Sequence, residues 1–134
     1  MLSVFPDLLA FGLLAPFLLR VALGFVFISF GKYKLGGGRA EKAKFFESLG
    51  WKYGLYVATV LGIIELVVGV FLLIGLYTQI AALAAALILL CALILKKKAP
   101  HGIESSSCFL FLLFIIALSL LVSGAGLFAF DLPL

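Results

Sequence analysis

Long apolar runs separated by short polar segments organise this sequence. A helix needs about 20 apolar residues to cross a bilayer, and four runs approach that length. The pattern predicts an all-α fold, an integral membrane four-helix bundle with a short interfacial helix in its first loop. The predicted single transmembrane domain covers residues 1–134, with spans at about residues 8–31, 54–76, 78–95 and 108–128.

Pro16 interrupts the first run. Proline has no backbone N–H, so inside a helix it removes the bond to the carbonyl of Gly12 and bends the chain. A continuous, kinked span would place Arg20 at the membrane centre. A short interfacial helix over residues 7–15, followed by a span over residues 16–35, would place Arg20 one turn inside the interface, where it can snorkel. The sequence leaves both arrangements open.

The composition agrees with a membrane protein. The chain is 66% hydrophobic and 12% charged, which is more apolar surface than a soluble domain of this size can bury. The net charge of +4 does not indicate nucleic-acid binding, because the basic residues gather in two short segments that flank apolar runs.

The two basic segments predict the orientation. Residues 32–53 (loop one) and 96–107 (loop three) hold nine of the ten basic residues, and the segments on the opposite side hold none. The positive-inside rule therefore places both loops in the cytoplasm and both termini outside. The expected location is the cell membrane, with several passes through it.

Loop one has structure of its own. Three glycines at residues 36–38 precede a stretch with charged and apolar faces at residues 39–49, which predicts an amphipathic interfacial helix. Gly50 can end this helix, and Trp51 and Tyr53 can anchor at headgroup depth. The helix either seats the bundle or offers a docking surface to a partner.

Two charges, Arg20 and Glu65, lie within apolar runs. A charge at the bilayer centre costs roughly 2.5–3.5 kcal/mol, so it normally faces protein, water or an opposite charge. Both residues share a helical face with glycines, which mark close helix packing. We therefore expect a buried Arg20–Glu65 ion pair, which fixes helix register, relays protons or binds a ligand. The two stripes are Arg20, Gly24 and Gly31, and Gly62, Glu65 and Gly69.

His101, Lys34 and Cys108 are expected at one cytoplasmic mouth, because the first span ends and the fourth begins on that face. No metal site is predicted, since the single histidine has no other ligand at a suitable spacing. Cys91 and Cys108 stand seventeen residues apart, outside any zinc or thioredoxin motif, and are expected to be buried free thiols. A serine among residues 105–107 is expected to cap the fourth helix.

Several segments form a recognisable series along the chain. They are residues 18–24 with Gly31 and Lys34, residues 45–50, residues 62–69 with 75–78, residues 101–102 and residues 124–131. In this order and spacing they resemble the DoxX family of small four-helix membrane proteins, and the similarity covers roughly residues 17–132.

The resemblance implies a four-helix membrane bundle with a redox-linked role. One branch of the family resembles the membrane subunit of a thiosulfate:quinone oxidoreductase, and other members are associated with complexes that handle oxidative and thiol stress. Carried over by position, it singles out Arg20, Lys34, Glu65 and His101 as ligand-binding residues. The chain departs from the family at Phe30, where many relatives have a histidine, which puts a role for that imidazole in doubt.

These observations lead to one functional hypothesis. The chain is expected to be a membrane subunit of a redox-linked complex that binds a small apolar or anionic ligand, with a quinone as the candidate cofactor. Arg20 and Glu65 would form the polar floor, and Lys34 and His101 would stand at the entrance. Expected partners are the lipid bilayer, a soluble redox protein on the cytoplasmic side and a second copy of the chain. The alternatives are a non-catalytic adaptor with a structural ion pair and a small-molecule transporter; the sequence does not decide whether the protein is an enzyme.

Overall fold

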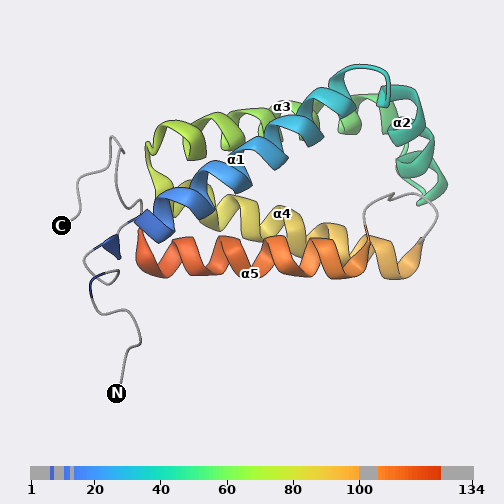
Figure 1. Cartoon of the computed structure of the whole chain (residues 1–134). Coiled ribbons are helices and arrows are strands. Elements are labelled where there is room, and N and C mark those ends of the chain that lie inside the picture. Colours follow the sequence, from blue (N-terminus) through green and yellow to red (C-terminus); the bar gives the residue numbers. More distant parts are fainter. Residues whose placement is uncertain (1–6, 8–10, 13, 100–105, 125–134) are drawn as a thin grey trace.

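The computed structural model describes residues 7, 11–12, 14–99 and 106–124. The described residues form helices and turns and contain no strand, which confirms the all-α prediction. In Figure 1 the helices are α1 (Leu14–Leu35), α2 (Arg39–Ser48), α3 (Gly54–Ile74), α4 (Thr78–Lys98) and α5 (Ser107–Ser123).

The four long helices form two pairs. α1 packs mainly on α3, and α4 packs mainly on α5, while α2 lies at one end of the molecule and packs on α3 (Figure 1). Within the second pair, the Gln79 side-chain amide near the start of α4 donates to the carbonyl of Leu121 near the end of α5, at 3.1 Å. The members of this pair therefore run antiparallel.

Three of these helices, α1, α3 and α4, are long and apolar enough to cross a membrane, and α5 is a shorter apolar helix of 17 residues. The fold is thus that of a membrane bundle. Its basic segments, α2 and the end of α4, lie at the same end of the molecule (Figure 1). Which side of the membrane this end faces stays a prediction of the positive-inside rule.

The first helix begins at Leu14, so Pro16 lies in its first turn. Backbone N–H groups in a first turn have no intrahelical partner, and proline costs little there. This matches the alternative in which the span covers residues 16–35. Of the interfacial helix expected at residues 7–15, residues 8–10 and 13 lie outside the described residues, and Leu14 and Ala15 belong to α1.

The other helices differ slightly from the expected spans. α3 ends at Ile74 because Gly75 adopts a left-handed conformation, with φ of 73°. α4 extends through its lysines to Lys98. α5 begins as predicted with a serine cap, the Ser106 hydroxyl accepting from the Phe109 N–H at 3.1 Å, and it ends at Ser123.

Glycines bring α1 and α3 into backbone contact. A Cβ atom at Gly24 would stand 2.9 Å from the carbonyl oxygen of Gly69, and one at Gly31 would stand 2.8 Å from that of Gly62. The two contacts show that α1 and α3 run antiparallel. They also fix the register between the helices, because backbone atoms cannot move aside as a side chain can.

The helix expected in loop one is α2, which folds back against the bundle. Ala43, Phe45 and Phe46 are buried on its inner face, and the Phe46 ring stacks on Trp51, with centroids 5.2 Å apart and planes 8° apart. The charged residues of α2 other than Lys42 are exposed. The helix therefore closes one end of the bundle with aromatic side chains.

Candidate functional site

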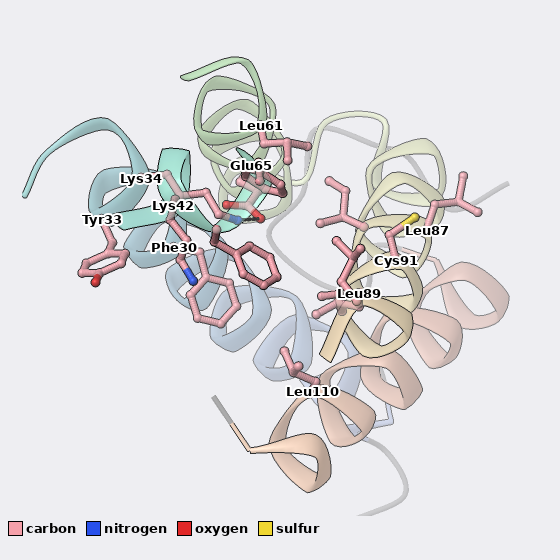
Figure 2. Close-up of a pocket in the computed structure, with 15 residues that line it drawn as sticks. Phe30, Tyr33, Lys34, Lys42, Leu61, Glu65, Leu87, Leu89, Cys91 and Leu110 are labelled. Carbon is pink, nitrogen blue, oxygen red and sulfur yellow. Dashed lines mark hydrogen bonds and ion pairs between the residues drawn. The ribbon is translucent and has the colours of Figure 1, made fainter. Parts of the chain in front are cut away.

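A cavity of about 340 Å³ lies between the two helix pairs, at the end that α2 closes (Figure 2). Side chains from all five helices line it, and most of them are aliphatic or aromatic. This size and lining are typical of small-molecule sites in proteins. The chemically distinctive lining residues are Tyr33, Lys34, Lys42, Glu65 and Cys91.

An ion pair forms the polar part of the cavity wall. Lys34 Nζ on α1 donates to Glu65 Oε1 on α3 at 2.5 Å, as the dashed line in Figure 2 marks. The side chains are 16% and 3% exposed, respectively. Such a pair in an apolar interior depends on each partner, because removal of one leaves the other charge uncompensated.

The expected pairing of Arg20 with Glu65 is not confirmed, because the structure gives Glu65 the partner Lys34. The reason lies in the register. Side chains on a helix lean toward its N-terminus. In antiparallel α1 and α3, Lys34 and Glu65 lean toward each other from either side of the Gly31–Gly62 contact, whereas Arg20 leans away from Glu65.

Gly62 also makes room for the lysine. A Cβ atom at Gly62 would stand 3.1 Å from the Cβ of Lys34. The aliphatic stem of Lys34 therefore passes across a position that has no side chain. The glycine stripe that indicated close packing thus sets the helix spacing and lets the amino group reach Glu65.

Arg20 lies at the other end of α1 and does not line the cavity. Its side chain is fully buried, as its position on a packing face predicted, and its guanidinium carbon lies 5.3 Å from the centroid of the Phe17 ring. That distance is within the range of a cation–π interaction. The structure thus separates the two intramembrane charges that the sequence pattern joined.

Glu65 carries one oxygen that is not used by the ion pair. Oε2 is buried and has no hydrogen-bond partner among the residues that the structure describes. A carboxylate accepts about four hydrogen bonds, and a buried acceptor left without a partner costs about 1–3 kcal/mol. Glu65, which lines the cavity, therefore carries a buried acceptor for which the described residues supply no hydrogen-bond donor.

Lys42 adds a second amino group to the lining, at a position that was not predicted as a site residue. Its Nζ lies 5.9 Å from the centroid of the Tyr33 ring and 6.0 Å from that of Phe45. The Tyr33 hydroxyl donates to Glu41 at 2.8 Å. Lys42 lies within residues 39–49, where the pattern predicts an amphipathic helix whose charged residues form a polar face. Its aromatic neighbours Tyr33 and Phe45 lie nine and three residues away in the chain, and no motif predicted that Lys42 would line a cavity.

The two cysteines differ in position. Both are free and exposed on the bundle, so the prediction of buried thiols is wrong. Cys91 lines the cavity and Cys108 does not. Of the three residues expected to ring one mouth, Lys34 lines the cavity, Cys108 lies outside the lining, and His101 lies outside the described residues.

Phe30 forms the wall where the two helix pairs meet. Its ring packs edge-to-face on Phe109 of α5, with centroids 6.5 Å apart and planes 83° apart, which is a favourable aromatic geometry. This contact joins α1 to α5 beside the cavity. In the described part of the chain, no group of three His, Cys, Asp or Glu residues could hold a metal ion.

Comparison with known proteins confirms the resemblance found in the sequence. The family model described as DoxX matches residues 15–97. The chain is also 35% identical over 115 residues to "Putative oxidoreductase CatD" of Bacillus subtilis (strain 168), which covers 85% of this chain and 82% of that protein. No solved structure matches the chain. The protein described here therefore belongs to the DoxX family.

Proposed function

We propose that the chain is the membrane subunit of a redox-linked complex and that it binds a quinone in the cavity beside Lys34 and Glu65. The observation that carries this proposal is the cavity itself, about 340 Å³ of mainly apolar space with an ion pair in its wall. The name of the Bacillus subtilis relative supports the redox link. Bound quinone would supply the electron-carrying chemistry, and a soluble partner would exchange electrons with it.

The lining residues fit a quinone. Phe30, Phe45 and Phe46 present aromatic surface to a flat apolar ring. The amino groups of Lys34 and Lys42 can donate to carbonyl oxygens, since an ammonium has three donors. The chain would therefore hold the ring between aromatic walls and orient it by its oxygens.

The position of the cavity suits a ligand that arrives from the membrane. Leu87 lines the cavity and is also 55% exposed on the outside of α4, and Cys91 one turn further along is exposed as well. The cavity therefore reaches the apolar surface of the bundle. A quinone dissolved in the bilayer could enter there without crossing water.

Trp51 offers a direct test. It is the single tryptophan of the chain, and it stacks on Phe46, which lines the cavity. Duroquinone added to the protein in nanodiscs should quench Trp51 fluorescence along a saturable curve. Quenching that rises linearly, as in collisions through lipid, would refute the proposal.

The two exposed cysteines provide matched variants for the same titration. Cys91→Phe adds bulk to the cavity lining, whereas Cys108→Phe makes the same change outside it. We expect the first variant to weaken duroquinone binding and the second to leave it unchanged. Equal effects of the two changes would argue that the quinone binds elsewhere.

The outer face of α2 favours a role for this helix in recruiting the soluble partner. Its inner face is buried against the bundle, which leaves Arg39, Lys44 and Glu47 exposed. Replacing Arg39 and Lys44 by alanine should abolish partner-dependent activity and leave duroquinone binding intact. An adaptor without a ligand site would lose its function in the same variant but would show no saturable duroquinone binding in the wild type.

A further inference from the structure

We infer, on the basis of the proposed quinone site, that the cavity binds the reduced, hydroxyl-bearing hydroquinone more tightly than the oxidised quinone. The inference starts from Glu65, which is 2% exposed and lines the cavity. One of its oxygens accepts from Lys34, and the other has no hydrogen-bond partner within residues 14–99 and 106–124. That second oxygen can be satisfied only by a donor.

Neighbouring side chains do not supply this donor. Lys34 is directed to Oε1, and the Tyr33 hydroxyl donates to Glu41. Lys42 also lines the cavity, but its Nζ lies at the Tyr33 and Phe45 rings and makes no hydrogen bond to Oε2. The cavity-lining residues of α4 and α5 are apolar apart from Cys91, whose thiol is a weak donor. Glu65 therefore keeps a buried acceptor, Oε2, that no described side chain uses.

The two redox forms of a quinone differ in what they can offer to this position. The oxygens of the oxidised form only accept hydrogen bonds, so they suit the lysine donors. Near Glu65, however, such an oxygen would place one acceptor against another. A hydroquinone hydroxyl both donates and accepts, so it can donate to Glu65 Oε2 while a lysine donates to it. The terminal torsion of a glutamate is broad, and a small rotation can turn Oε2 toward the bound hydroxyl.

A competition experiment tests this preference on the unmodified protein. Duroquinone is titrated against Trp51 fluorescence in nanodiscs, and durohydroquinone or its dimethyl ether is then added under nitrogen to displace it. Because hydrogen bonds to charged groups are the strong ones, we expect durohydroquinone to bind at least about tenfold more tightly than duroquinone. The ether, which has the same ring but no donor, should compete no better than duroquinone.

Two glutamate variants locate the effect. Glu65→Gln keeps an acceptor but adds a donor that suits the oxidised form, so the tenfold preference should fall to near equality. Glu47→Gln makes the same change at an exposed position of α2 outside the lining, and should keep the preference. The wild-type comparison needs no substitution, so it decides the question even if Glu65→Gln does not fold.

The outcomes separate this inference from the proposed function. Saturable duroquinone binding with equal affinity for the two redox forms, or an ether that competes as well as the hydroquinone, would overturn the inference and leave the quinone site standing. A preference that survives in Glu65→Gln would also overturn it. If duroquinone gave no saturable quenching and no displacement were seen, both the inference and the proposed function would be refuted.

Discussion

The two helix pairs are held together by different means. Gly24 and Gly31 bring the backbone of α1 against that of α3, whereas α4 packs on α5 through buried alanines and leucines, such as Ala85 on one side and Ala117 on the other. The first pair also carries the charges of Arg20 and Glu65, which are buried, and of Lys34, which is partly buried. The second pair contributes an apolar wall.

This difference indicates which helix pair must keep an exact register. Backbone contact at glycines admits one register between two helices, and that register decides which charges can meet. Alanine and leucine packing fills space well but tolerates exchange of similar volume. The glycine pair therefore sets the geometry of the site, and the alanine pair completes the cavity around it. Four substitutions test this division, in order of decreasing effect.

The largest loss of stability should follow from breaking the ion pair. Lys34→Met leaves the Glu65 charge buried without its partner, which typically costs about 3–5 kcal/mol. Chemical unfolding in mixed micelles would measure the change in free energy of unfolding. Lys32→Met, on the exposed face of the same helix, is the matched control and should change little.

Double variants of the same residues identify the partner and separate stability from binding. Lys34→Met with Glu65→Met should recover most of the stability, because a buried pair is often replaceable by apolar residues, but it should abolish duroquinone binding. Exchanging the charges of Lys34 and Glu65 should recover part of the loss, whereas exchanging those of Arg20 and Glu65 should not. The opposite result would show that Arg20 is the true partner.

The next largest effect should come from adding a methyl group in the glycine pair. The new Cβ in Gly31→Ala would stand 2.8 Å from the carbonyl oxygen of Gly62 and 2.9 Å from the backbone nitrogen of Leu66, so the helices must separate. Overpacking of this kind costs about 1–3 kcal/mol, measurable in the same unfolding assay. Gly37→Ala introduces its Cβ into open space and should be nearly neutral; similar losses in the two variants would contradict the proposed role of backbone contact.

A smaller effect is expected where the pairs meet. Phe30→Leu removes the edge-to-face contact with Phe109, and such aromatic pairs contribute about 0.5–1.5 kcal/mol. Thermal unfolding should show the loss, together with weaker quenching of Trp51 by duroquinone. Phe25→Leu, at a side chain 59% exposed on the same helix, should alter neither quantity.

The smallest effect should come from removing a methyl group in the alanine pair. Ala85 is fully buried, and glycine within a helix costs roughly 0.5–1 kcal/mol relative to alanine. Ala85→Gly should therefore lower the free energy of unfolding less than Gly31→Ala does. Ala84→Gly, at a partly buried neighbouring position, is the control for the change in helix propensity. A larger loss from Ala85→Gly than from Gly31→Ala would show that α4 and α5, not α1 and α3, form the pair with the stricter packing.

Much of the fold was contained in the sequence. Length and hydropathy predicted the membrane helices, and the loop-one pattern predicted α2, because both are properties of a short stretch of chain. The faces that carry Arg20 and Glu65 were also predictable, since a charge in an apolar run must face the protein interior. The serine at the start of α5 was found from local chemistry alone.

The tertiary structure decided which residues meet. Lys34 rather than Arg20 pairs with Glu65 because the antiparallel register and the lean of helical side chains bring the first two together, and neither property can be read from one helix alone. Lys42 enters the lining because α2 folds back on α3. Cys91 of α4 lines the cavity and Cys108 of α5 does not, which the sequence did not predict. A hydrophobic pattern is local, so the sequence alone predicts it. The chemistry of a cavity depends on distances between segments that are far apart in the chain, and only tertiary packing sets those distances.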